Sequence, residues 1–222
     1  MKNIVLFGGG THVSYCIDIL QKENKYQIVG ITDPFAKIGS EILGYKIIGR
    51  QEEIKKLVVE YNIHAGLITI GDNWTRKLVR DIIVKILPDF EFVMAIHPST
   101  IIGSNVMIGK GTVIMAGCII NPGANIHEFC FLATGAILEH DSLMEDYSSL
   151  SAGSVTGGKV RIGKFSAITL GVILFDRIEI GEHTVIGSGS LVTKNIPDNV
   201  LAYGTPAKII RKREIGEKYL AS

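Results

Sequence analysis

The chain of 222 residues is long enough for one domain or two small ones, each with its own hydrophobic core. Its 23 Lys and Arg residues nearly balance 22 Asp and Glu residues, and the formal net charge of +1 argues against a protein that binds nucleic acid or an anionic membrane surface. With 46% hydrophobic and 20% charged residues, the composition excludes intrinsic disorder.

Residues 1–95 alternate between expected strands and expected helices. The apolar runs predict strands at 3–7, 27–32 and 65–70, and the helical spacing predicts helices at 12–21, 51–61 and 73–87. A Gly-rich turn, 8–10, separates the first strand from the first helix. This order predicts a small parallel α/β domain of Rossmann-like type.

The Gly-rich turn is the first candidate site. Backbone N–H groups at Gly10, Thr11 and His12 can cradle a phosphate, because they lie between a strand end and a helix N-terminus. Asp33, at the end of the second strand, suits a ribose or base contact. The simpler interpretations are a tight turn that needs glycine and a solvated turn residue.

From Ile96 to Val192 an aliphatic residue occupies every sixth position, with Thr156 as the exception. A period of six fits neither a helix nor an alternating strand, but it fits short strands joined by tight turns, three to each coil. We expect a parallel β-helix over 96–197, with Cys118 and Cys130 pointing into its core. Residues 198–222 then form a loop and a tail, and we expect 214–222 to be a short helix or frayed.

The cysteines and the N-terminus indicate the compartment. The three cysteines form no C-x-x-C pair, which indicates neither a disulfide framework nor a zinc site. Residues 1–8 are too short an apolar run for a signal peptide, and no apolar run is long enough to span a membrane. We expect a cytoplasmic protein without membrane insertion and without a metal.

One histidine stands at an expected coil corner with carboxylates on both sides. In the segment Glu139-His140-Asp141 these side chains should point outward. A carboxylate on one ring nitrogen fixes the tautomer and makes the other nitrogen a stronger base. The alternative is a solvated, charged turn.

Nearly the whole chain resembles one family. The α/β region, the hexads, the segment 137–141 and a closing Gly204-Thr205-Pro206-Ala207-Lys208 occur in the order seen in bacterial nucleotide-sugar N-acetyltransferases and sialic acid O-acetyltransferases. The resemblance implies a left-handed β-helix, against the usual handedness of β-crossovers. It also implies a homotrimer that transfers acetyl from acetyl-CoA to a nucleotide-linked amino-sugar in surface glycan synthesis, such as O-antigen or capsule.

The resemblance also implies roles for individual residues. His140 matches the general base, Asp141 the residue that orients it, and Gly158 a glycine whose N–H faces the thioester oxygen. The remaining matches are Ser149, Leu170 and Ser188 for coenzyme A and Gly10, Thr11, His12, Asp33 and Gly71 for the sugar-nucleotide.

Three alternatives differ in chemistry. A γ-type carbonic anhydrase shares the β-helix, but its pair of zinc-binding histidines about five residues apart is absent, since no H-x-x-x-x-H occurs. A sialic acid O-acetyltransferase would use the same site. A non-catalytic scaffold subunit would give no reason for the His–Asp corner or the Gly-rich loop.

Overall fold

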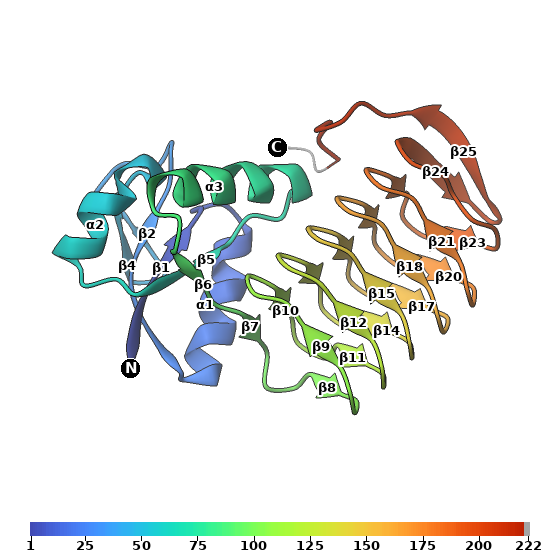
Figure 1. Cartoon of the computed structure of the whole chain (residues 1–222), viewed down its shortest axis with the longest axis horizontal. Coiled ribbons are helices and arrows are strands. Elements are labelled where there is room, and N and C mark those ends of the chain that lie inside the picture. The colour runs from blue at the N-terminus through green and yellow to red at the C-terminus, as the bar shows by residue number, and fades with distance from the viewer. Residues whose placement is uncertain (220–222) are drawn as a thin grey trace.

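A computed structural model describes residues 1–219 and divides into an α/β part and a coiled β part, which lie side by side (Figure 1). The α/β part is a six-stranded sheet with the strand order β3-β4-β2-β1-β5-β6. Its strands are β1 (Lys2–Phe7), β2 (Tyr26–Thr32), β3 (Glu41–Ile42), β4 (Tyr45–Gly49), β5 (Ala65–Ile68) and β6 (Glu91–Phe92). Its helices are α1 (His12–Glu23), the 3₁₀ turn η1 (Gln51–Glu53), α2 (Ile54–Glu60) and α3 (Asn73–Ile86).

The predicted alternation of strands and helices is confirmed. Strand β5 ends at Ile68, two residues earlier than expected, and neither the hairpin of β3 and β4 nor strand β6 was predicted. The start of α3 follows local chemistry: Asp72 Oδ1 accepts hydrogen bonds from the N–H and the hydroxyl of Thr75, at 2.9 and 2.6 Å. Such an N-cap satisfies a backbone donor that the first turn leaves unpaired.

The repeat region is a parallel β-helix, as predicted. Strands of two residues pair with strands 18 residues further on, for example Val113 with Phe131. From Ile114 onward the second residue of each strand is buried, and the aliphatic side chains at these positions form one continuous core that includes Cys118 and Cys130. The period of six therefore arises because each of the three sides of a coil places one aliphatic side chain in the core.

The three sheets of the β-helix present different outer faces. The covered sheet contains β7 (Ala95–Ile96), β10 (Val113–Ile114), β13 (Phe131–Leu132), β16 (Ser149–Leu150), β19 (Ala167–Ile168) and β22 (Val185–Ile186). The aliphatic sheet contains β8 (Ile101–Ile102), β11 (Ile119–Ile120), β14 (Ile137–Leu138), β17 (Val155–Thr156), β20 (Ile173–Leu174) and β23 (Leu191–Val192). The polar sheet contains β9 (Met107–Ile108), β12 (Asn125–Ile126), β15 (Leu143–Met144), β18 (Arg161–Ile162) and β21 (Glu179–Ile180).

Only one of these faces is buried by the α/β part. Val113 and Phe131 on the covered sheet pack into a cluster with residues of α1, and so these outward side chains are buried. In the aliphatic sheet, the first residue of each of the six strands is Ile, Val or Leu. Within residues 1–219 nothing covers Ile101 or Ile173 on this face, and their side chains are 62% and 48% exposed. An aliphatic stripe of this kind indicates a contact surface.

Aromatic rings stack along one corner of the β-helix, where it meets α3. Phe129, Tyr147, Phe165 and His183 lie 18 residues apart, with successive ring centroids 5.1, 5.1 and 4.7 Å apart and near-parallel planes. All four have positive φ, between 53° and 60°, in the turn that aims each ring at the next coil. Trp74 of α3 lies edge-on to Phe165, at 5.2 Å. This ladder joins the two parts of the molecule.

The C-terminal region returns to the α/β part. An antiparallel hairpin, β24 (Val200–Gly204) and β25 (Ala207–Lys212), continues the covered sheet where we had predicted a loop. The following segment then runs back toward the start of α3 (Figure 1). Residues 214–219 contain no helix, so that part of the tail prediction is wrong, and 220–222 lie outside the described residues.

Candidate active site

A pocket of about 710 Å³ opens at the carboxyl ends of β1, β2 and β5. Parallel α/β sheets bind ligands at this edge, because the loops that follow the strands diverge there. Its lining contains all five residues predicted to contact a sugar-nucleotide: Gly10, Thr11, His12, Asp33 and Gly71. The structure therefore brings together residues that are up to 61 positions apart in the sequence.

Asp33 organises the Gly-rich loop. Its Oδ2 accepts a hydrogen bond from Gly9 N–H at 2.7 Å, and its Oδ1 accepts from the N–H groups of Phe35 and Ala36, both at 2.8 Å. Burial works to raise the pKa of this carboxyl, but the three N–H donors and the charge of Arg50 outweigh it and hold the pKa below its usual value. Asp33 is thus a carboxylate that fixes the loop, with lone pairs left for a ligand.

Gly10 and Gly71 are glycines for different reasons. A Cβ on Gly10 would meet nothing within 4 Å, because this position faces the open pocket. A Cβ on Gly71 would lie 2.3 Å from Cε1 of His12, so only glycine lets that ring pack here. Burial, and then the charge of Arg76, lower the pKa of His12, so the imidazole in the pocket wall is neutral at pH 7.

The His–Asp corner has the geometry of a general base. His140 Nδ1 lies 2.9 Å from Asp141 Oδ2, and both side chains are exposed. A carboxylate can only accept, so Nδ1 carries the proton of this bond and the lone pair of the neutral ring is on Nε2. Nε2 faces Gly158, where a Cβ would approach it to 2.4 Å. A hollow of about 200 Å³ beside it is lined by His140, Gly158, Lys159, Asp176 and Arg177.

Thr156, the exception in the aliphatic hexads, supports this corner. Its side chain points into the core, and its hydroxyl accepts a hydrogen bond from Glu139 N–H at 2.9 Å. An aliphatic residue there would leave the donor next to His140 unpaired, which costs about 1–3 kcal/mol when buried. The break in the pattern was a signal for a site, although its meaning required the structure.

Gly158 has a partner that the sequence did not suggest. Its N–H donates to Asp176 Oδ1 at 2.7 Å. A thioester oxygen could accept a hydrogen bond from Gly158 N–H only if the Asp176 carboxylate released it first. The role of Gly158 as an oxyanion donor stays a prediction.

Of the side chains predicted to contact coenzyme A, Leu170 and Ser188 lie close together and Ser149 lies apart from them. Leu170 and Ser188 are exposed on turns of neighbouring coils, where Leu170 O accepts from Gly189 N–H at 2.8 Å. Ser149 lies on the covered sheet, is 2% exposed, and its hydroxyl is 3.2 Å from both Asn73 Nδ2 and the Tyr219 hydroxyl. In this chain Ser149 therefore joins the two parts of the molecule, and its contact with a coenzyme stays a prediction.

Arg76 lies beneath the pocket, and sequence patterns did not reveal its role. The side chain is 1% exposed, and all five of its N–H donors have partners. The acceptors are Phe129 O, Ile70 O, Gly71 O, Asn73 Oδ1 and Tyr147 O, at 2.7–3.1 Å. No donor remains for a ligand, so Arg76 shapes the pocket floor and ties α3 to the aromatic ladder.

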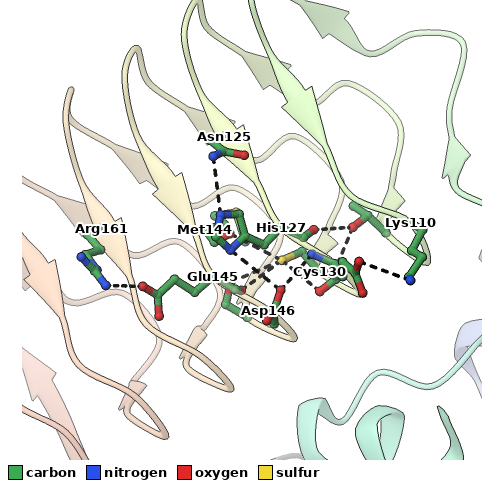
Figure 2. Close-up of polar contacts among 11 residues, drawn as sticks. Lys110, Asn125, His127, Cys130, Met144, Glu145, Asp146 and Arg161 are labelled. Atoms are coloured by element: carbon green, nitrogen blue, oxygen red, sulfur yellow. Dashed lines mark hydrogen bonds and ion pairs between the residues drawn. The ribbon is translucent and has the colours of Figure 1, made fainter.

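A second histidine with a nearby carboxylate lies on the polar sheet, as Figure 2 shows. His127 Nδ1 is 3.8 Å from Asp146 Oδ1, beyond hydrogen-bond distance, and its Nε2 is 3.5 Å from Asn125 Nδ2. His140, with its partner at 2.9 Å, is the better oriented base. Within residues 1–219, no group of three or more His, Cys, Asp or Glu could hold a metal ion. No helix in the same range has the length and apolarity to cross a bilayer.

The pocket and the His140 corner do not meet within one chain. Their linings share no residue, and the pocket lies over the α/β sheet whereas the corner joins the aliphatic and polar sheets.

Two family models match the chain. Residues 3–83 match the PglD N-terminal domain, and residues 99–134 match the bacterial transferase hexapeptide repeat. UDP-N-acetylbacillosamine N-acetyltransferase of Bacillus subtilis is 31% identical over 118 residues, which is 52% of each protein. The chain thus spans about half the length of this curated relative.

Solved structures extend the likeness to nearly the full chain. PerB from Caulobacter crescentus, solved in complex with CoA and GDP-perosamine, is 29% identical, has a TM-score of 0.85, and is matched over 95% of this chain and 98% of PerB. The acetyltransferase domain of PglB from Neisseria gonorrhoeae, solved with acetyl coenzyme A, shares the fold: TM-score 0.87, 24% identity, and 94% and 99% coverage. With its PglD-type α/β domain and its left-handed hexapeptide β-helix, the chain is homologous to the UDP-N-acetylbacillosamine and GDP-perosamine N-acetyltransferases.

Proposed function

We propose that this chain transfers acetyl from acetyl-CoA to the amino group of a nucleotide-linked amino-deoxy-sugar that enters a bacterial surface glycan. The observation that carries the proposal is the His140 Nδ1–Asp141 Oδ2 contact of 2.9 Å in the β-helix. The α/β part of the same chain contains a pocket of about 710 Å³ lined by the glycine-rich loop. The PerB homologue, solved with CoA and GDP-perosamine, supports it. A form of that enzyme with histidine replaced by asparagine was solved with the same two ligands.

The reaction follows from the free Nε2 of His140. The sugar amine attacks the thioester carbonyl carbon, the C–S bond breaks, and the sulfur leaves as a thiolate, which becomes the thiol of CoA when the His140 imidazolium passes it the proton taken from the amine. Nε2 takes the proton that the amine loses, and the Asp141 carboxylate stabilises the imidazolium that forms; general base catalysis of this kind contributes roughly 10² to 10⁴ in rate. No cysteine is available as a nucleophile, because all three are buried, and burial raises the pKa of Cys118 to about 11 and of Cys130 to about 12.

We further propose that the working unit is a homotrimer whose active site lies between two chains. The aliphatic sheet offers an apolar face that three copies can bury around an axis. The separation of the nucleotide pocket from His140 supports a site in which one chain supplies the sugar-nucleotide and another supplies the base. Since acetyl-CoA and nucleotide-sugars are cytoplasmic metabolites, we place the reaction in the cytoplasm.

The experiment that tests this function is thiol release from acetyl-CoA. Purified protein is incubated with acetyl-CoA and, separately, with GDP-, UDP- and dTDP-linked amino-sugars and with sialic acid. Turnover with at least one amino-sugar and none with sialic acid is expected. Turnover with sialic acid alone would establish the O-acetyltransferase instead, and release with none of them would support a scaffold.

A further inference from the structure

The C-terminal segment places a lysine at the nucleotide pocket. Lys218 lines the pocket together with Gly8, Gly10 and Thr11 of the glycine-rich loop. This lysine lies more than 200 positions from that loop in the sequence, and the returning segment brings the two together. We infer that Lys218 binds the diphosphate of the nucleotide-linked substrate, an inference that rests on the proposed function.

The charge of the pocket calls for such a cation. Within residues 1–219, the charged side chains that line it are Asp33, Asp72 and Lys218. The two carboxylates repel a diphosphate, although their oxygens accept bonds from the loop and from Thr75. His12 is neutral because burial lowers the pKa of its ring. Lys218 is thus the lining residue that can offset the charge of two phosphates.

In the described part of the chain, the other cations near the pocket do not line it. Arg50 Nη1 donates to the carbonyl groups of Asp33 and Ala36. Arg76 lies below the pocket floor, but all five of its donors are bonded to carbonyl or amide oxygens of the chain. A phosphate could recruit Arg76 only by leaving those acceptors buried and unpaired, which is costly. The burden of binding the diphosphate then falls on the loop N–H groups and Lys218.

The segment around Lys218 is anchored on both sides. Before it, the Glu217 carboxylate accepts two bonds from the Arg211 guanidinium, at 2.6 and 3.1 Å, and the Arg213 guanidinium donates to Glu217 O. After it, the Tyr219 hydroxyl lies 3.2 Å from Gly71 O and 3.2 Å from Ser149 Oγ. Two fixed neighbours limit where the lysine can reach and lower the entropy lost when it binds.

The close fit of the segment against α3 supports a fixed position. A Cβ on Gly216 would lie 2.8 Å from Trp74 Nε1, so the backbone runs directly over the indole. The space left between this segment and the start of α3 is about 10 Å³, roughly one water probe. The tail is therefore a packed part of the fold that carries Lys218 to the pocket.

Calorimetric titration of this chain with GDP, UDP and dTDP tests the inference, with guanosine, uridine and thymidine as probes that lack the diphosphate. Lys218→Met should weaken binding of the nucleoside diphosphate by about ten- to a hundredfold, the usual loss for a charged hydrogen bond. Nucleoside binding and the melting temperature should not change. Lys218→Arg should recover most of the affinity. The matched control is Lys212→Met, an exposed lysine of β25 outside the pocket lining.

Two results would overturn the inference alone. Lys218→Met could bind the nucleoside diphosphates as tightly as the wild-type protein, or it could lose nucleosides and nucleotides equally, which would make the segment merely structural. A wild-type protein that bound none of GDP, UDP and dTDP would overturn the proposed function as well, so the two failures are distinguishable.

Discussion

At the scale of single residues, Gly10 is a position where a substitution should affect ligand binding without affecting folding. A Cβ at this position would meet no protein atom within 4 Å, whereas most glycines of the coils have no such room. Gly10→Val should therefore fold normally and fill the place of a phosphate. We expect the KM for the nucleotide-sugar to rise at least about tenfold, by analogy with one lost phosphate contact, while the KM for acetyl-CoA stays constant.

Steady-state kinetics with each substrate varied in turn measures the effect of Gly10→Val. The matched control is Gly135→Val, at a coil turn where a Cβ would also meet nothing within 4 Å. Gly135 has a φ of 69°, so this variant also shows how much activity is lost through backbone strain alone. Equal rises in both KM values for Gly10→Val would assign the loop a structural role.

The sequence predicted residues whose role depends on a strand end or a coil corner. Gly10 and His12 follow β1 and Asp33 follows β2, and the parallel sheet brings such positions to one edge. Ser149 shows the limit of this reasoning. The resemblance implied a contact with coenzyme A for Ser149, and only the packing of α3 and Tyr219 against β16 decides that it is buried.

At the scale of elements, Arg76 holds α3 against the aromatic ladder. Its guanidinium donates to Phe129 O and Tyr147 O of two successive coils. Arg76→Met would leave several buried carbonyl groups without a donor, each worth about 1–3 kcal/mol. We expect the free energy of unfolding to fall by at least about 3 kcal/mol, a large part of typical stability.

Thermal unfolding followed by circular dichroism measures this loss for Arg76→Met. Lys77→Met serves as the control, because Lys77 lies on the next position of α3 and forms a partly exposed ion pair with Asp81, an interaction worth little. An unchanged melting temperature for Arg76→Met would contradict the anchoring role.

The elements were predictable to different degrees for a physical reason. The coils and α1 follow from a local period in the hydrophobic residues, and their boundaries are close to those predicted. The aromatic ladder has a period of 18 that is also present in the sequence, but its meaning requires knowing that each coil closes after 18 residues. The hairpin of β24 and β25 depends on pairing with β22, a contact outside the hexad pattern.

At the scale of the whole molecule, the aliphatic sheet predicts self-association. Ile173 lies on this sheet and is 48% exposed. Ile173→Glu would place a charge in the buried face of the proposed trimer, and we expect it to dissociate into monomers and to lose activity. Light scattering at micromolar concentration should give a trimer for the wild-type protein.

Val59→Glu is the matched control for this test. Val59 is 83% exposed on α2, far from the aliphatic sheet in the fold, and its variant should remain trimeric and active. If the wild-type protein were monomeric and fully active, the proposed trimer and the proposed active site between two chains would both be contradicted.

Thiol release by His140→Asn, measured beside the wild-type protein with acetyl-CoA and a saturating nucleotide-linked amino-sugar, tests the proposed chemistry most directly. Asparagine keeps a polar side chain at an exposed corner, and so the melting temperature should not change. The loss of the general base should lower kcat/KM by about 10² to 10⁴. His127→Asn, which removes the histidine whose carboxylate partner is 3.8 Å away, should retain wild-type activity. A His140→Asn protein with near-wild-type kcat would contradict the proposed mechanism and would leave Glu139-His140-Asp141 as a charged turn.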